Sequence, residues 1–141
     1  MTVLTVDDQA IFPLTVRRLL AAANGFQQVG EAASGARAIE LAATLQPDLV
    51  LVDVRMAEMD GIETAPHMHA LIPEAVIVLI SVGEIPDAAR LAPAVAACLR
   101  KQELSVRTLR RCRRRVFRGA LVRTPIATGC ALPNTPRAVG G

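Results

Sequence analysis

The stretch Leu49-Val50-Leu51-Val52-Asp53 is a short apolar run that ends in a carboxylate. Three other short, mostly apolar runs are followed in the same way by polar or charged side chains: residues 3–6 by Asp7 and Asp8, residues 76–80 by Ser81, and residues 96–100 by Lys101. Runs of this length, rich in aliphatic and partly β-branched residues, are typical of buried strands in a parallel sheet. We therefore interpret the four runs as strands of one parallel sheet.

The polar groups that follow these runs have a common chemistry. Ligands of open α/β sheets bind beyond the carboxyl ends of the strands, where the three carboxylates, the hydroxyl and the ammonium would meet. Carboxylate oxygens suit a hard divalent cation such as Mg²⁺, and an ammonium or hydroxyl group suits the oxygens of a phosphoryl group. The sequence thus predicts a site for a divalent cation and a phosphoryl group.

Helical patterns lie between the strand patterns along the chain. A weaker strand is expected at residues 28–32, and helices are expected at residues 10–23, after Ser34, from the Asp60-Gly61 turn to about Leu71, and at residues 103–118. Alternation of this kind predicts an α/β fold, a doubly wound five-stranded parallel sheet with helices on both faces.

Prolines and glycines indicate where this pattern weakens. Pro66 falls inside a predicted helix and should kink or shorten it. Pro86 and Pro93 flank a stretch that leaves room for a helix of only one or two turns. Residues 119–141 contain loop-forming residues without apolar periodicity, and we expect a flexible tail there.

Composition narrows the class of protein further. Of the 141 residues, 52% are hydrophobic but only 2% are aromatic, which predicts an aliphatic core. No uncharged apolar stretch approaches the roughly 20 residues of a membrane span, and no signal peptide is visible, so we expect a cytoplasmic protein without membrane contact. The three cysteines, Cys98, Cys112 and Cys130, lack the spacing of a zinc site.

Basic residues are concentrated toward the C-terminus. Residues 1–101 hold seven basic and twelve acidic groups, a balance of −5, whereas residues 102–141 hold nine basic and one acidic, a balance of +8. The arginines that could contact an anion or nucleic acid lie on the last predicted helix: Arg107, Arg110, Arg111, Arg114, Arg115 and Arg118, together with Arg113. They indicate either phosphate contact or docking to an acidic partner, or else a solvated face, which we favour because no helix-turn-helix follows.

Several motifs resemble the receiver domain of bacterial two-component response regulators, over about residues 2–118. They are Val6-Asp7-Asp8, Pro47 through Met56, Met59-Asp60-Gly61, and Lys101-Gln102-Glu103-Leu104-Ser105. The last motif and Gly30-Glu31-Ala32 are similar to the subfamily that usually carries a LuxR-type helix-turn-helix, for which no sequence is present here. The resemblance implies a flavodoxin-like receiver fold for residues 1–118, with residues 119–141 as the tail.

The resemblance also implies a role for each group at the sheet edge. Asp53 would be the phosphoacceptor, since a carboxylate at a strand end can attack phosphorus to give an acyl phosphate. Mg²⁺ would be bound directly by Asp8, Asp53 and the backbone carbonyl of Arg55, with Asp7 acting largely through water.

Two further residues would act on the phosphoryl group itself. Lys101, the only lysine of the chain, would place a positive charge against the acyl phosphate. Ser81 would donate a hydrogen bond to a phosphoryl oxygen and draw its loop inward. The implied partners are a sensor histidine kinase as phosphodonor and an output protein of unknown identity, and the oligomeric state is left open.

Departures from the family pattern bear on signalling. Ala57 replaces a usual proline, Val82 replaces a smaller residue, and Cys98 replaces the aromatic residue that usually switches between exposed and buried positions. An alternative to a signalling receiver is a truncated or degenerate relative of a transcription regulator that binds nucleic acid non-specifically. We expect no enzyme activity, because related hydrolases need an aspartate where Arg55 stands.

Overall fold

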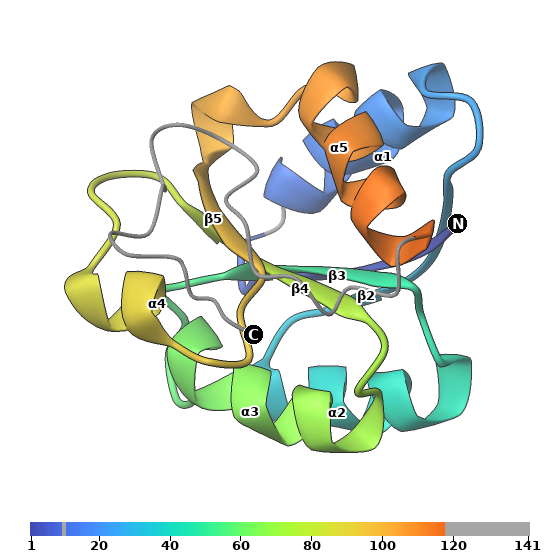
Figure 1. Ribbon diagram of the computed structural model, residues 1–141. Helices are drawn as coiled ribbons and strands as arrows, with labels where there is room; N and C mark the ends of the chain where they lie inside the picture. Colours follow the sequence, from blue (N-terminus) through green and yellow to red (C-terminus); the bar gives the residue numbers. More distant parts are fainter. Residues whose placement is uncertain (10, 118–141) are drawn as a thin grey trace.

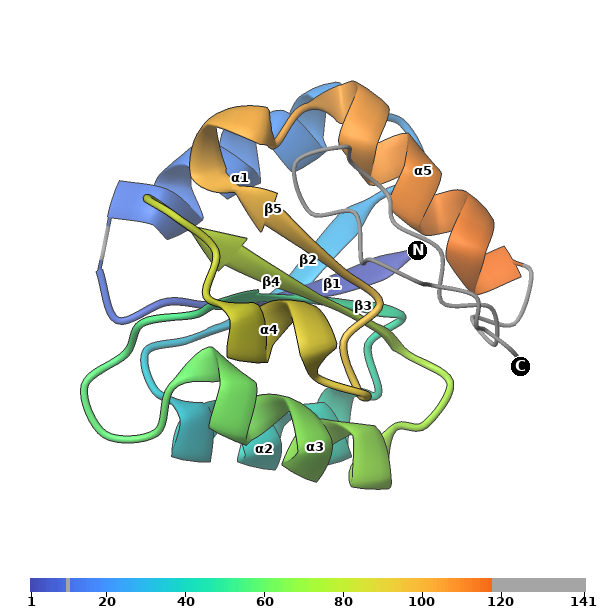
Figure 2. The ribbon, with the colours of Figure 1, turned by 60° about the vertical axis from the view of Figure 1, so that its left-hand side comes forward.

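The computed structural model describes residues 1–9 and 11–117 and contains one five-stranded parallel sheet (Figures 1 and 2). The order of the strands across the sheet is β2-β1-β3-β4-β5. Their bounds are Thr2–Val6 for β1, Gln27–Ala32 for β2, Leu49–Asp53 for β3, Val76–Ser81 for β4 and Ala97–Arg100 for β5. The five predicted strands are confirmed, with shifts of one residue at the starts of several of them.

Helices cover both faces of this sheet, as the doubly wound architecture requires. The helices are α1 Ile11–Ala22, α2 Gly35–Leu45, α3 Gly61–Leu71, α4 Asp87–Leu91, α5 Val106–Phe117 and a 3₁₀ turn, η1, at Lys101–Glu103. Figure 1 shows α1 and α5 on one face, and α2, α3 and α4 on the other. The predicted fold class is therefore confirmed.

Two of the three inner strands, β3 and β4, form the centre of the core. Every residue of both strands is buried, and they pair in parallel with Val52 opposite Leu79. Their aliphatic side chains pack between the two helical layers, where area removed from water contributes roughly 25 cal/mol per Å². β2, at one edge, is partly exposed, which explains its weaker apolar pattern.

Local sequence features explain where α2 and α3 begin and why α4 is short. Ser34 caps α2 as predicted, its hydroxyl accepting a hydrogen bond from the Arg37 N–H at 3.1 Å. Asp60, which was predicted as a turn residue, is also the N-cap of α3, where its carboxylate and Glu63 form a reciprocal capping box. α4 has five residues, which confirms the short fourth helix.

Two helix predictions need correction. α3 continues through Pro66 to Leu71, so the proline does not shorten it; Pro66 is exposed, and the buried side chains of Ala65 and Met68 anchor the helix. α5 begins at Val106 and not at Glu103, because the Ser105 hydroxyl accepts a hydrogen bond from the Thr108 N–H at 3.2 Å.

Other expectations lie at the limits of the described chain. None of the helices in the described part is long and apolar enough to cross a membrane. Cys98 and Cys112 are buried. Cys130, Arg118 and the predicted tail at residues 119–141 lie outside the described residues, as do the side chains of Arg113, Arg114 and Arg115.

Candidate functional site

Three carboxylates meet at the carboxyl ends of β1 and β3. Asp7, Asp8 and Asp53 each offer one oxygen, and these oxygens all lie within 4.8 Å of one another. The register explains the meeting: β1 and β3 are neighbours with Val6 opposite Val52, so the residues that follow them are level. Asp7 is 3% exposed and Asp53 is 5% exposed, whereas Asp8 faces solvent.

Lys101 supplies the positive charge of this cluster. Its Nζ atom lies 2.8 Å from Asp7 Oδ2 and 3.7 Å from Asp53 Oδ2, although β5 lies at the far edge of the sheet from β1. One ammonium offsets only one of three negative charges, which leaves the cluster with a formal charge of −2. A site with excess negative charge and oxygen donors suits a divalent cation.

Backbone N–H groups orient all three carboxylates. Asp7 Oδ1 accepts a hydrogen bond from the Gln9 N–H at 2.8 Å. Asp53 Oδ1 accepts one from the Arg55 N–H at 3.2 Å. Asp8 Oδ2 accepts one from the Ala57 N–H at 3.1 Å, which ties the loop after β1 to the loop after β3.

Gln9 and Ala57 are site residues that the sequence reasoning missed, and Arg55 was predicted for its backbone carbonyl but not for its N–H. An aspartate that accepts from the residue two positions on is a common turn, so a signal was present for Asp7 and Asp53. No signal was present for Ala57, whose contact with Asp8 spans 49 positions.

The Asp53 carboxyl group has a perturbed pKa. Burial and, to a smaller extent, the negative charge of Asp7 raise the pKa of Asp53, the Arg55 N–H and Lys101 lower it, and the net result is a pKa raised from 3.8 to about 6. The carboxyl group is thus largely ionised at neutral pH. Its negative charge is destabilised by burial, and a bound cation would reduce this unfavourable free energy.

Gly61 makes room for this arrangement. A Cβ atom at Gly61 would collide with the backbone carbonyl of Asp53, and the Gly61 N–H donates to the Val54 carbonyl at 2.9 Å. The start of α3 therefore touches the end of β3, and only a residue without a side chain allows this approach.

Ser81 ends β4 but is turned toward its own loop. It is 1% exposed, and its hydroxyl donates to the carbonyls of Gly83 at 3.4 Å and Glu84 at 3.2 Å. Cys98 on β5 is buried against α4, with its sulfur 3.5 Å from the Ala89 carbonyl. Neither side chain belongs to the carboxylate cluster in this state.

The predicted anion-contacting arginines lie elsewhere. Arg107 and Arg110 are exposed and Arg111 is half-buried, all three on α5 and so on a face of the sheet rather than at the strand ends. The other three predicted contacts, Arg114, Arg115 and Arg118, lie outside the described side chains.

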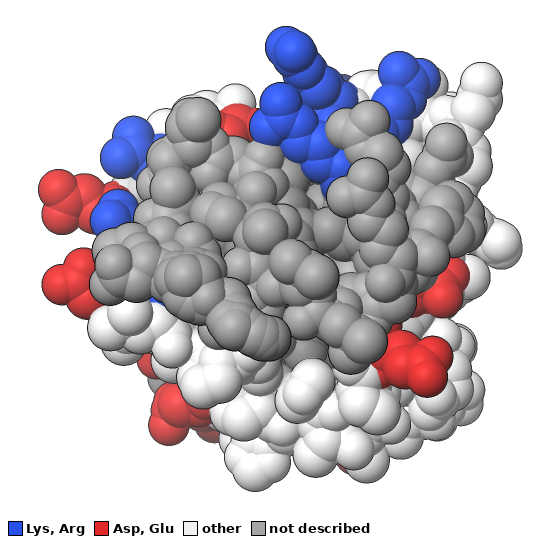
Figure 3. Space-filling view, in the orientation of Figure 1, with Lys and Arg blue, Asp and Glu red and all other residues white. Residues whose placement is uncertain are grey.

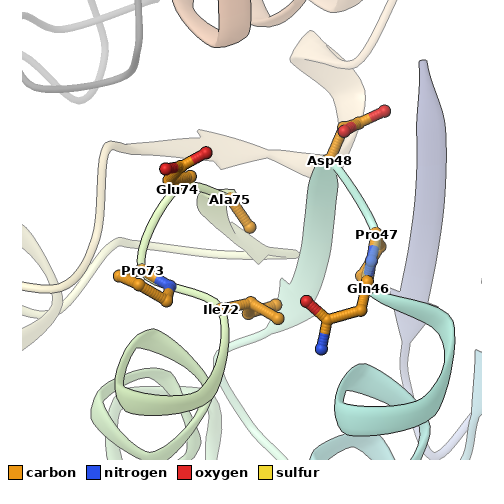
Figure 4. Close-up of a pocket in the computed structure, with 7 residues that line it drawn as sticks. All are labelled: Gln46, Pro47, Asp48, Ile72, Pro73, Glu74 and Ala75. Atoms are coloured by element: carbon orange, nitrogen blue, oxygen red, sulfur yellow. The ribbon is translucent and has the colours of Figure 1, made fainter.

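A second acidic pocket lies at the opposite end of β3 and β4 and is distinct from the cluster (Figure 4). It has a volume of about 370 Å³ and is lined by Gln46, Pro47, Asp48, Ile72, Pro73, Glu74 and Ala75. The Asp48 carboxylate accepts hydrogen bonds from the N–H and hydroxyl of Thr2 at 2.9 and 3.2 Å. This carboxylate therefore links the starts of β1 and β3, which is a structural role.

Comparison with known proteins agrees with the fold. A family model for the response regulator receiver domain matches residues 3–109, and the chain therefore belongs to this family of two-component signalling domains. The structure of the signal receiver domain of a modulated diguanylate cyclase from Desulfovibrio desulfuricans is similar, with a TM-score of 0.73 and 25% identity over 84% of this chain and 95% of that one.

Curated relatives include both a response regulator and an enzyme. The nitrate/nitrite response regulator protein NarL of Escherichia coli is 38% identical over 57% of this chain and 38% of its own length. A protein-glutamate methylesterase/protein-glutamine glutaminase of Pseudoalteromonas atlantica is 40% identical over 56% of this chain and 21% of its own length. This chain thus matches only a minor part of either relative.

Proposed function

We propose that this chain accepts a phosphoryl group on Asp53 from a sensor histidine kinase, in a reaction that depends on Mg²⁺, and thereby alters a surface for an output partner. The observation that carries the proposal is the meeting of three carboxylates within 4.8 Å beside the Lys101 ammonium. Membership of the receiver family supports it.

The donor set fits a divalent cation. Asp8 and Asp53 would hold Mg²⁺ directly, Asp7 through water, and the Arg55 main-chain carbonyl would add a neutral oxygen. The net negative charge of the cluster and the solvent-facing position of Asp8 both suit a hydrated cation. When bound, Mg²⁺ supplies charge neutralisation that lets a phosphoryl dianion approach the carboxylates.

Asp53 would carry the chemical step. Its Oδ1 atom is held by the Arg55 N–H, which leaves Oδ2 to attack phosphorus. The P–N bond of the kinase phosphohistidine breaks as the P–O bond forms, and the imidazole leaves with the bonding electrons and takes up a proton. Lys101, 3.7 Å from Oδ2, is placed to pair with an oxygen of the resulting acyl phosphate.

The response would pass through Ser81 and its loop. A hydroxyl that turns toward a phosphoryl oxygen must leave the Gly83 and Glu84 carbonyls, and this frees the loop that leads into the five-residue helix α4. Because Cys98 replaces the usual aromatic and is buried, we place the readout on this loop and helix, where Val82 and Leu91 are exposed. We also propose that the described domain has no hydrolytic activity of its own, since Arg55 stands where a second aspartate would be needed.

The test is uptake of a phosphoryl group from a small phosphodonor with Mg²⁺, followed by mass spectrometry of the intact chain. Wild type should gain one phosphoryl group, and the gain should be lost in Asp53→Asn and on removal of Mg²⁺ by chelation. Glu58→Gln, an exposed acid on the same loop, serves as the matched control and should be labelled as wild type is. Equal labelling of Asp53→Asn would refute the assignment.

A further inference from the structure

We propose that the surface formed by α1 and α5 binds the phosphate backbone of nucleic acid without sequence preference. The surface is defined by Arg18 on α1 and by Arg107 and Arg110 on α5, and we refer to it as the arginine face. This activity would be separate from phosphorylation of Asp53, because these arginines lie on a face of the sheet and not at the strand ends.

The two helices that carry the arginine face are neighbours. α1 and α5 lie side by side on one face of the sheet in both ribbon views (Figures 1 and 2). Figure 3 shows basic side chains gathered over these helices at the top of the view, whereas acidic side chains lie mostly around the sides and lower half. Arg18, Arg107 and Arg110 are all exposed.

The three arginines of the arginine face form no ion pair with another described residue. Within the part of the chain that the structure describes, Arg18, Arg107 and Arg110 make no ion pair, in contrast to Arg17, which pairs with Glu31. The α5 sequence, residues 106–117, contains six arginines and no acidic residue. Ordinary solvated surfaces carry both signs of charge. The excess positive charge of this face therefore favours the binding of an anion from solution.

The position of Arg107 argues against a purely structural role. It is the second residue of α5, where the positive end of the helix dipole disfavours a cation. Arginines placed only to stabilise α5 would lie in its last turn. Arg107 instead places an exposed positive charge in the first turn of α5.

The chemistry of the arginine face favours nucleic acid over a membrane. An amphipathic helix binds a lipid surface by burying an apolar face, but Leu109 and Cys112 already bury that face of α5 in the protein core. Only polar head-group contact would remain, which gives weak attachment.

The same surface is unlike a protein–protein interface. Among the described residues, three large hydrophobic side chains are exposed: Leu71 on α3, Val82 in the loop before α4, and Leu91 on α4. None of these three lies on α1 or α5. Protein partners usually need an apolar or aromatic centre in the interface, whereas interfaces with nucleic acid are polar and strongly basic. Arginine also forms bidentate contacts with phosphate, and it provides all but one of the 16 basic residues in the chain.

The experiment measures binding of the full chain to a short fluorescein-labelled DNA duplex of mixed sequence by fluorescence anisotropy at several salt concentrations. Each phosphate contact contributes about −0.9 to the slope of log affinity against log salt. Wild type should bind with a steep negative slope. Arg107→Gln/Arg110→Gln should flatten it by about 1.8, so that the loss of affinity between about 50 and 200 mM salt becomes about tenfold smaller.

Matched controls separate this effect from a general change in charge. Arg110→Gln should weaken binding, whereas Arg37→Gln, which removes the same charge from exposed α2 on the opposite face, should bind within about twofold of wild type. Glutamine is tolerated in helices about as well as arginine, and circular dichroism would show that the variants stay folded.

Three results would overturn the proposal. Wild type could fail to bind the duplex in a salt-dependent manner, or the double variant could bind as wild type does. Unlabelled poly-L-glutamate of equal charge could displace the labelled duplex as well as unlabelled duplex does, which would assign the arginine face to acidic polypeptides instead. Asp53→Asn should bind the duplex as wild type does, so failure of the proposed phosphorylation would leave this test intact.

Discussion

Replacement of Asp53 by asparagine should stabilise the metal-free fold at neutral pH. The Asp53 carboxyl is 5% exposed, and its pKa is raised from 3.8 to about 6 by burial and by the charge of Asp7. A raised pKa means that the folded state binds this proton more tightly than the unfolded state does. Ionisation of Asp53 therefore opposes folding, and asparagine removes that opposition.

The magnitude follows from the size of the shift. A displacement of about two pKa units corresponds to about 3 kcal/mol of folding free energy at a pH above both pKa values. We expect a gain of about 1 to 3 kcal/mol near pH 7, since asparagine also gives up the attraction between Asp53 and Lys101. The gain should fall as the pH is lowered from about 6 to 4, and it should vanish where the wild-type carboxyl is protonated in both states.

The assay is urea unfolding followed by far-ultraviolet circular dichroism at several pH values, because the chain has no tryptophan or tyrosine for intrinsic fluorescence. Glu58→Gln is the matched control, since it removes one exposed carboxylate from the loop after β3. Mg²⁺ should stabilise wild type by mass action and should reduce the advantage of Asp53→Asn. Loss of stability in Asp53→Asn at neutral pH, or a gain that does not depend on pH, would refute the reasoning.

Three other predictions test the surroundings of the carboxylate cluster. Lys101→Met should cost about 3 kcal/mol of unfolding free energy without Mg²⁺, because it leaves the buried Asp7 carboxylate without its ion-pair partner; Lys101→Arg should cost less in the same urea titration. Gly61→Ala should cost about 1 to 3 kcal/mol through its collision with the carbonyl of the candidate phosphoacceptor, whereas Gly83→Ala, with open space around its Cβ position, should be close to neutral. Ser81→Ala should take up a phosphoryl group as wild type does but should lose the shift of the Gly83 amide resonance that we expect on phosphorylation; an unchanged shift would exclude Ser81 from the response.

Local patterns in the sequence were sufficient for most of the fold. The run at residues 49–53 and its counterparts are short, apolar and separated by helix-length segments, a pattern that is typical of buried parallel strands. The Ser34 cap was readable because a hydroxyl at that position satisfies a free N–H of the next helix. Pro66 and the start of α5 were misjudged, because packing of the buried helix face and the Ser105 cap outweighed the simpler signals.

The carboxylates of the site could be predicted from the sequence, but the contacts that orient them could be predicted only in part. Parallel strands bring their carboxyl ends to one edge, so the meeting of Asp7, Asp8 and Asp53 follows from the order of strands and polar residues alone. The Ala57 N–H on Asp8 joins residues 49 positions apart, and no local pattern contains it. The need for glycine at position 61 likewise follows only from the contact between the start of α3 and the end of β3.

The class of fold, the edge of the sheet that carries the chemistry, and the gathering of Asp7, Asp8 and Asp53 there could be read from the sequence, because strand burial and the polar residue after each strand are local properties. The packing of the whole chain was needed to show that Lys101 reaches Asp7 across the sheet, that Ser81 is bonded to its own loop, and that α5, with its exposed Arg107 and Arg110, lies beside α1. These contacts depend on the order of the strands and on the packing of helices against them, and such long-range contacts form only when the whole core is assembled.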